Sequence, residues 1–112
     1  MSTLETATLN CVTGHANAFN LQAQVGGIPV DLTGKTITAA ITYQGSGSPL
    51  ALSIGSGINV ISAALGQLQI LLTLGQVNAM TIDTTAYVYL TVWNADNSQW
   101  AYGSFPMVIT RG

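Results

Sequence analysis

The feature that most constrains the fold is a strict alternation of apolar and polar residues. In AFNLQAQV (18–25) every second residue is apolar, and KTITAAITY (35–43) and TTAYVYLTVW (84–93) continue the pattern with many β-branched residues. A period of two residues places apolar side chains on one face of a strand, and β-branched residues favour strands. Only GQVNAMTID (75–83) leans towards a helix, and it predicts one short helical turn.

Turn signals separate these stretches from shorter strand candidates. QGSGSP (44–49) and NADNS (94–98) are typical of a loop and a hairpin turn, and QWAYGSFPMVIT (99–110) predicts the closing strand. About seven to nine strands follow, spaced by turn signals every eight to twelve residues or so. The sequence therefore predicts an all-β fold, a single antiparallel β-sandwich over 14–112, preceded by an N-terminal arm or strand over 1–13.

The chain is unusually poor in charge, which excludes some functions. Hydrophobic residues make up 48% and charged residues 5%, and the formal net charge is -2. Lys35 and Arg111 cannot form the basic patch that nucleic acid requires, so we expect no nucleic-acid partner. Low net charge gives little repulsion between copies, which favours a homo-oligomer.

The sequence carries no signal for export or membrane insertion. The start, MSTLETATLN, lacks the basic and apolar regions of a signal peptide. The longest apolar stretch, LGQLQILLTLG, is interrupted by glutamines and is far below the ~20 residues of a membrane span. We expect a protein made in a cytoplasm, with no membrane partner.

Two of the six charged side chains belong to one turn, Asp31-Leu32-Thr33-Gly34-Lys35. A carboxylate at the first position accepts hydrogen bonds from backbone N–H groups two or three residues on. Gly34 supplies the positive φ that such a turn often needs. Asp31, Thr33 and Gly34 are therefore predicted to serve the backbone rather than chemistry.

No constellation for catalysis, a metal or a cofactor stands out. Cys11 and His15 could form a nucleophile and base, but a small buried hydrophobe and a turn residue are the commoner roles. One cysteine and one histidine cannot complete a zinc site. The acids show no pairing across a cleft, as glycosidase chemistry would need; they are Glu5, Asp31, Asp83 and Asp96. We expect a protein that is not an enzyme.

An aromatic stripe is the candidate site. In AYVYLTVW the alternation places the aliphatic residues on one face and Tyr87, Tyr89 and Trp93 on the other. Trp100 and Tyr102 on the return strand could pair beside them. Three interpretations remain open: packing within the chain, an interface with another protein, or a platform for a carbohydrate.

These signals together resemble the small immunoglobulin-like β-sandwich domains of tailed-bacteriophage virion proteins, such as N-terminal domains of baseplate and tail-fibre proteins and some head-attached fibres. The motif G-x-P-x-D-L-T-G of that family is matched by Gly27 to Gly34 in GIPVDLTG. Gly66 opens a later glycine-hydrophobic strand, Tyr87 or Tyr89 the tyrosine-bearing strand, and Gly103 the last strand. The chain departs from the family in lacking an acidic residue after the tyrosine.

The resemblance implies a noncatalytic structural component of a phage particle, located in the virion after synthesis in the host cytoplasm. An adaptor in the tail or baseplate, a collar component or a capsid-decorating protein fits a chain without a receptor-binding region. Other virion proteins would be its partners, with trimers or hexamers common in the family. Tyr87, Tyr89, Trp93, Trp100 and Tyr102 are the predicted interface. The alternative is a carbohydrate-binding module that uses the same aromatic face.

Overall fold

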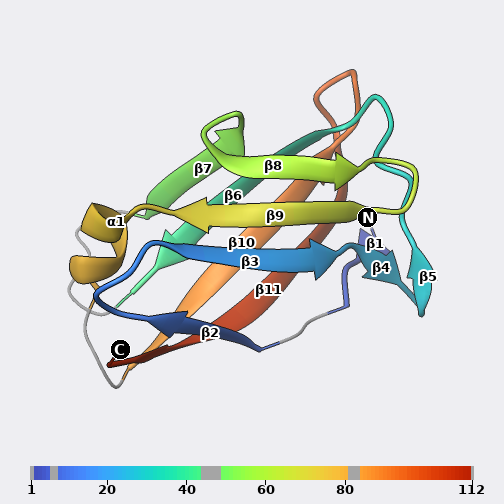
Figure 1. The fold of residues 1–112 in the computed structure, drawn as a ribbon. Coiled ribbons are helices and arrows are strands. Elements are labelled where there is room, and N and C mark those ends of the chain that lie inside the picture. Colours follow the sequence, from blue (N-terminus) through green and yellow to red (C-terminus); the bar gives the residue numbers. More distant parts are fainter. Residues whose placement is uncertain (1, 6–7, 44–48, 81–83, 112) are drawn as a thin grey trace.

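The computed structural model describes residues 2–5, 8–43, 49–80 and 84–111, and these residues form an all-β fold as predicted (Figure 1). Asp83 and most of the predicted loop 44–49 lie outside the described residues. The described residues contain one helix, α1 (Leu74–Asn78), which begins with a capping box between Thr73 and Gln76. The strands are β1 (Ser2–Thr3), β2 (Leu9–Val12), β3 (Asn17–Gln22), β4 (Gln24–Val25), β5 (Ile28–Pro29), β6 (Thr36–Thr42), β7 (Leu50–Ile54), β8 (Gly57–Ser62), β9 (Gln67–Leu72), β10 (Thr85–Trp93) and β11 (Gln99–Thr110).

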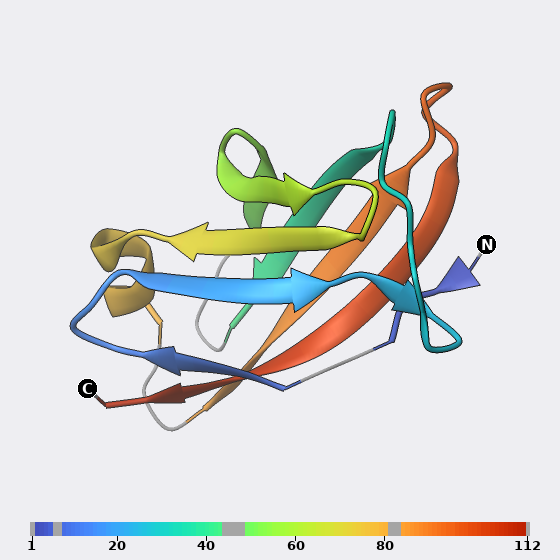
Figure 2. The same cartoon turned by 45° about the vertical axis from the view of Figure 1, so that its right-hand side comes forward.

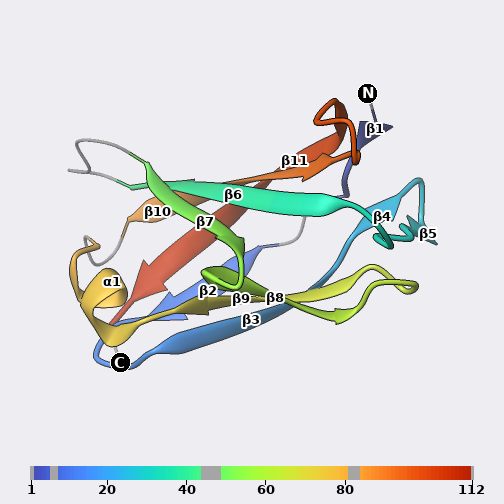
Figure 3. The ribbon, with the colours of Figure 1, turned by 90° about the horizontal axis from the view of Figure 1, so that it is seen from above.

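Nine of these strands belong to one hydrogen-bonded sheet that folds into two layers. The order is β1-β11-β10-β6-β7-β8-β9-β3, with β2 also pairing with β11, while β4 and β5 form a separate small hairpin. Seen from above, β11, β10, β6 and β7 form one layer and β8, β9 and β3 the other (Figure 3). The turn between β7 and β8 carries the sheet from one layer to the next, so the arrangement is barrel-like.

The prediction of a purely antiparallel sheet is wrong in three pairings. β1 and β2 both run parallel to β11, and β7 runs parallel to β8 over two residue pairs. The sheet is therefore mixed. The N-terminal segment causes the first two exceptions, because it enters the sheet beside β11 and runs in the same direction. The parallel contacts span only two to four residue pairs, too few for an alternation to show how the strands pair.

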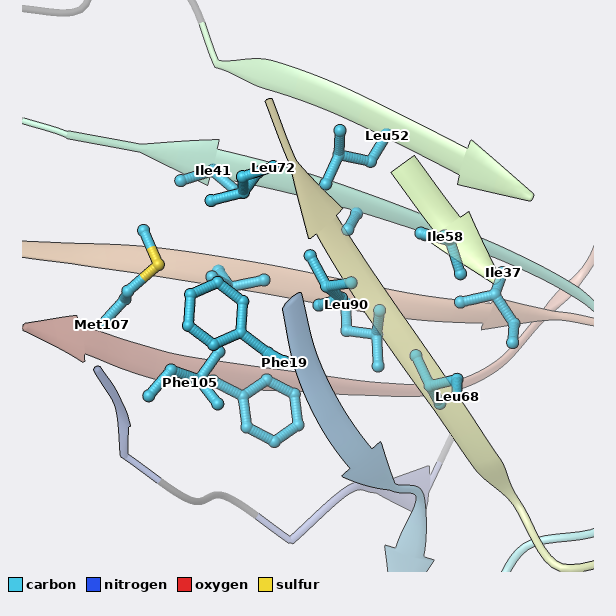
Figure 4. Close-up of a cluster of buried hydrophobic side chains, with 14 of the residues drawn as sticks. Phe19, Ile37, Ile41, Leu52, Ile58, Leu68, Leu72, Leu90, Phe105 and Met107 are labelled. Carbon is cyan, nitrogen blue, oxygen red and sulfur yellow. The ribbon is translucent and has the colours of Figure 1, made fainter. Parts of the chain in front are cut away.

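The core lies between the two layers and follows the alternation of the longest strands. In β10 and β11 every second side chain is buried, including Val88 and Leu90 on β10 and Met107 on β11. Figure 4 shows how side chains from both layers meet. The labelled residues are Phe19, Ile37, Ile41, Leu52, Ile58, Leu68, Leu72, Leu90, Phe105 and Met107.

Two glycines allow close contact between segments that are distant in the sequence. At Gly103 on β11, an added Cβ would stand 2.9 Å from Leu4 Cβ, so glycine gives the N-terminal segment room to pack there. At Gly66 an added Cβ would stand 2.6 Å from the Val30 carbonyl oxygen and 2.8 Å from that of Ala23. Gly66 also has φ +69, a conformation that other residues adopt at a cost.

Gly66→Ala is expected to lower the free energy of unfolding by about 3 kcal/mol or more, because it combines left-handed strain with a clash against backbone that cannot move aside. Gly75→Ala is the matched control. Gly75 lies in α1 with open space around it and a negative φ, and alanine there is neutral or stabilising by up to about 1 kcal/mol. Urea unfolding followed by circular dichroism measures both. Equal stability of the two variants would contradict this account of Gly66.

Candidate interaction surface on the outer face of β10 and β11

Three exposed tyrosines mark the outer face of the layer that contains β10 and β11. Tyr87, Tyr89 and Tyr102 are 44%, 46% and 49% exposed. Tyr89 on β10 pairs with Ser104 on β11, and Thr91 pairs with Tyr102. Tyr102 is therefore a diagonal neighbour of Tyr89, about 7–8 Å away between strands. The structure thus places these three rings on one uncharged surface, called the aromatic face below.

The two tryptophans at the end of this surface are half-buried. Trp93 Nε1 donates a hydrogen bond of 2.8 Å to Thr38 Oγ1 on β6, which fixes the indole against the sheet. Trp100 lies at a register shift, since Val92 pairs with Ala101 and Trp93 with Gln99. Its ring packs against the core, and the Lys35 ammonium stands 5.0 Å from the ring centroid. These contacts hold both tryptophans in place: Trp93 on the outer face and Trp100 against the core.

A shallow groove of about 440 Å³ lies beside Tyr89 on the same layer. Small side chains create it: Ala40 on β6 pairs with Ala51 on β7 and with Tyr89 on β10. The hydroxyl-bearing residues Thr38, Ser53 and Thr91 also line it. Sequence reasoning missed the groove, although the alternation of TITAAIT places Thr38 and Ala40 opposite the buried isoleucines.

The turn at residues 31–35, which precedes β6, is bonded to the turn of the β10–β11 hairpin. The Asp31 carboxylate accepts a hydrogen bond from the Thr33 backbone N–H at 2.9 Å, and Gly34 has φ +74. Lys35 Nζ donates to Asn94 Oδ1 at 3.1 Å while it lies over the Trp100 ring. The two charged residues therefore have different roles. Asp31 orders the turn, and Lys35 connects the turn to the hairpin.

The candidate nucleophile pair lacks the properties that covalent catalysis needs. Cys11 on β2 is fully buried in the core, and this burial raises the pKa of its thiol. His15 is exposed in the turn that follows β2. A nucleophilic cysteine needs a lowered pKa and access to substrate, and Cys11 has neither.

The described ranges also contain no cluster of three or more His, Cys, Asp and Glu side chains able to hold a metal ion. Within the same part of the chain, no helix has the length and hydropathy to cross a membrane.

Cys11 is expected to react with a thiol reagent such as dithionitrobenzoate only after unfolding, because its sulfur is buried and its pKa is raised. The absorbance of released thionitrobenzoate, measured in buffer and in concentrated urea, checks this. Rapid reaction of one thiol per folded chain would contradict it.

Two aspartates should make stability depend on pH in the acid range. Hydrogen bonds from the Thr33 side chain and backbone, with a smaller effect of the Lys35 charge, lower the pKa of Asp31. Hydrogen bonds from the Ser98 side chain and backbone lower the pKa of Asp96. A carboxyl group whose pKa is lower in the folded state contributes stability above its unfolded pKa. That contribution is lost as pH falls through the folded pKa.

We therefore expect the free energy of unfolding to be steady above about pH 5 and to fall below about pH 4. The double variant Asp31→Asn and Asp96→Asn keeps an acceptor oxygen at both sites but has no charge there to titrate. Its stability should fall less steeply over the same acid range. Urea titrations at several pH values measure this, and identical slopes would show that the two turns do not contribute.

Comparison with known proteins supports the fold and leaves the family open. No protein-family model matches the chain, and no curated protein matches it. Among solved structures, the chain is similar to the N-terminal domain of ORF48 of phage TP901-1, with a TM-score of 0.65. The alignment covers 97% of this chain and 95% of that domain at 14% sequence identity. At this identity the likeness concerns the fold: this chain has the fold of a phage protein domain along nearly its whole length.

Proposed function

We propose that the chain is a noncatalytic structural component of a bacteriophage particle, related to the small immunoglobulin-like domains of tailed-phage virion proteins. The observation that carries the proposal is the similarity of fold to a phage protein domain over 97% of the chain. A role as a tail or baseplate adaptor or as a capsid-decorating protein suits a compact unit of this kind. Its location would be the virion, after synthesis in the host cytoplasm.

The aromatic face is proposed as the surface that binds other virion proteins. Tyrosines are favoured at interfaces because each buries a large apolar ring while its hydroxyl remains able to hydrogen-bond. No Lys, Arg, Asp or Glu among the described residues lies in a strand, so the strands of this face would expose no charge to a partner. A standard interface buries about 800 Å² per partner. Trp93 extends the tyrosine surface towards the β10–β11 hairpin, where Trp100 packs against the core with the Lys35 ammonium over its ring.

A carbohydrate-binding module is the second candidate, favoured by the groove beside Tyr89. An aromatic ring next to hydroxyl groups provides a stacking surface and hydrogen bonds for a sugar. Thr38 Oγ1 accepts the Trp93 hydrogen bond, which leaves its own hydroxyl proton to donate elsewhere. A glycan array probed with the native chain and with Tyr89→Ser tests this function. Binding of a defined glycan that is lost in the variant would favour the carbohydrate function over the structural one.

The triple variant Tyr87→Ser, Tyr89→Ser and Tyr102→Ser should stay folded but fail to join particles. Each exposed substitution is expected to cost less than about 1 kcal/mol of stability, whereas the interface would lose its main apolar area. Quantitative mass spectrometry of density-purified virions, from cells that encode the native or the variant chain, measures incorporation. Native chain should be present in a fixed copy number per particle.

The matched control removes exposed apolar side chains from the other layer. Ile61 and Leu71 are 55% and 40% exposed there, and Ile61→Ser with Leu71→Ser should leave incorporation unchanged. Absence of the native chain from particles would overturn the proposed function. Normal incorporation of the triple variant would overturn the aromatic face as the interface.

A further inference from the structure

The outer face of the second layer carries side-chain amides, in contrast to the tyrosines of the first layer. Asn20 and Gln22 on β3 are exposed, and they pair with Gln69 and Gln67 on β9. Asn59 on β8 continues the row, because it pairs with Gln69. Strands β8, β9 and β3 lie in front of the other strands in Figure 1, so their outer face is open to solvent. None of the three strands contains a charged residue.

A pocket of about 350 Å³ opens on this face, within the range of about 300–1,000 Å³ that is typical of small-molecule sites. It is lined by Asn20, Leu21, Gln22, Ile61, Gln67 and Leu68. The side chains of Leu21 and Leu68 pack on the core side of the sheet, so these two residues form the floor. A bulge in β8 leaves Ile61 without a partner on β9, and its side chain is 55% exposed. The pocket therefore has an apolar floor, amide walls and one exposed aliphatic side chain.

Hydrogen bonds within the chain orient two of these amides and leave others available. Gln22 Nε2 donates to the Leu65 carbonyl oxygen at 3.0 Å, and Gln22 Oε1 accepts from Gln24 Nε2 at 2.7 Å. Asn20 Oδ1 accepts from Gln69 Nε2 at 3.1 Å, which leaves the Asn20 Nδ2 group as an unused donor. The hairpin of β4 and β5 lies beyond this end of β3 (Figure 2). The Gln67 side-chain amide forms no hydrogen bond with another described residue, so both its donor and its acceptor are available.

We propose that this pocket binds the acetamido group of an N-acetylated sugar. Asn20 and Gln67 are diagonal neighbours across β3 and β9, about 7–8 Å apart, so one small group between them can bond to both. The acetamido carbonyl oxygen would accept from Asn20 Nδ2, and its N–H would donate to Gln67 Oε1. Its methyl group would pack against Ile61. Gln22 Oε1 has a second lone pair, which can accept a hydrogen bond from a neighbouring sugar hydroxyl.

The lining of the pocket favours this ligand over charged ones and over a peptide. No lining residue is charged, so an ionic ligand would lose its hydration without gaining a counter-charge. A peptide also contains amides, but they repeat along an extended chain. Here the available amides and the exposed aliphatic side chain of Ile61 line one confined pocket. A neutral group that joins one amide to one methyl, next to hydroxyl groups, fits this arrangement.

The inference goes beyond the proposed function, which assigns protein partners to the aromatic face. The pocket lies in the second layer, whereas the aromatic face and the groove beside Tyr89 belong to the first (Figure 3). A ligand in the pocket would therefore leave the aromatic face free. In a particle with several copies of the chain, weak single contacts with N-acetylated glycans would add up through multivalency. Only this consequence rests on the proposed function; the pocket itself does not.

The first test is a titration of the native chain, labelled with nitrogen-15, followed by NMR. The probe is the methyl β-glycoside of N-acetylglucosamine, and its matched control is methyl β-glucoside, in which a hydroxyl replaces the acetamido group. We expect saturable shifts of the side-chain amide signals of Asn20 and Gln67 with the probe only. The dissociation constant should lie in the millimolar range, because a single sugar makes few contacts. Added salt should not change it, since no charge lines the pocket.

The second test compares Gln67→Ala with Asn59→Ala. Both variants remove one amide from the same outer face, and neither amide is hydrogen-bonded to another described side chain, so both variants should fold. Only Gln67 lines the pocket. We expect the dissociation constant of the acetylated probe to rise about fivefold or more in Gln67→Ala and to change less than about twofold in Asn59→Ala. The spectra of the variants report directly whether each one is folded.

Several outcomes would overturn the inference. These are the absence of saturable shifts at probe concentrations up to about 100 mM, equal affinity for the two glycosides, or equal affinity of the two alanine variants. N-methylacetamide that binds as tightly as the acetylated glycoside would also overturn it, because an amide alone, as in a peptide, would then account for binding. Shifts confined to the groove beside Tyr89 would overturn it and favour the carbohydrate function proposed there. Incorporation into virions is measured separately, so the pocket can fail while the proposed structural role stands.

Discussion

The arrangement of the whole sheet depends on the pairing of β11 on both of its sides. On one side it pairs with β10 along nearly its full length, and on the other it pairs in parallel with β1 and β2. Gly103 makes the second contact possible, since any larger residue there would collide with Leu4. Because Leu4, Leu9 and Cys11 are buried by these pairings, the N-terminal segment completes the core instead of extending from it.

How much of this could be predicted follows from the length of each segment. The alternation in TITAAIT and TAYVYLTVW indicated β6 and β10 nearly to the residue, because seven to nine residues define a face. The parallel pairs could not be predicted, since β1 and the contact between β7 and β8 involve only two residues each. The closure of the sheet into a barrel-like form rests on those short contacts, and for this reason the sequence suggested a simple sandwich.

The candidate site shows the same limit. Alternation alone placed Tyr87, Tyr89 and Trp93 on a common face, and the structure has them there with two of them well exposed. The alternation did not predict the position of Trp100. This residue lies at the register shift opposite Trp93, and its ring packs against the core and the Lys35 ammonium. A bulge of this kind leaves no mark in the periodicity. The groove beside Tyr89 was also missed. Alanines on an outer face form a groove only when their cross-strand neighbours are small as well, and the sequence does not show which residues those neighbours are.

The charged side chains of the described residues serve the turns and leave the strands uncharged. Asp31 and Asp96 order turns through hydrogen bonds to Thr33 and Ser98, and Lys35 links one of these turns to the hairpin that contains the other. Among the described residues the charged side chains lie in turns and loops, so no strand of either layer carries a charge. Tyrosines bind a partner by burying apolar area while their hydroxyls remain able to hydrogen-bond. On an uncharged face such contacts form without the cost of desolvating an ion, which is why the aromatic face is the surface proposed for a partner.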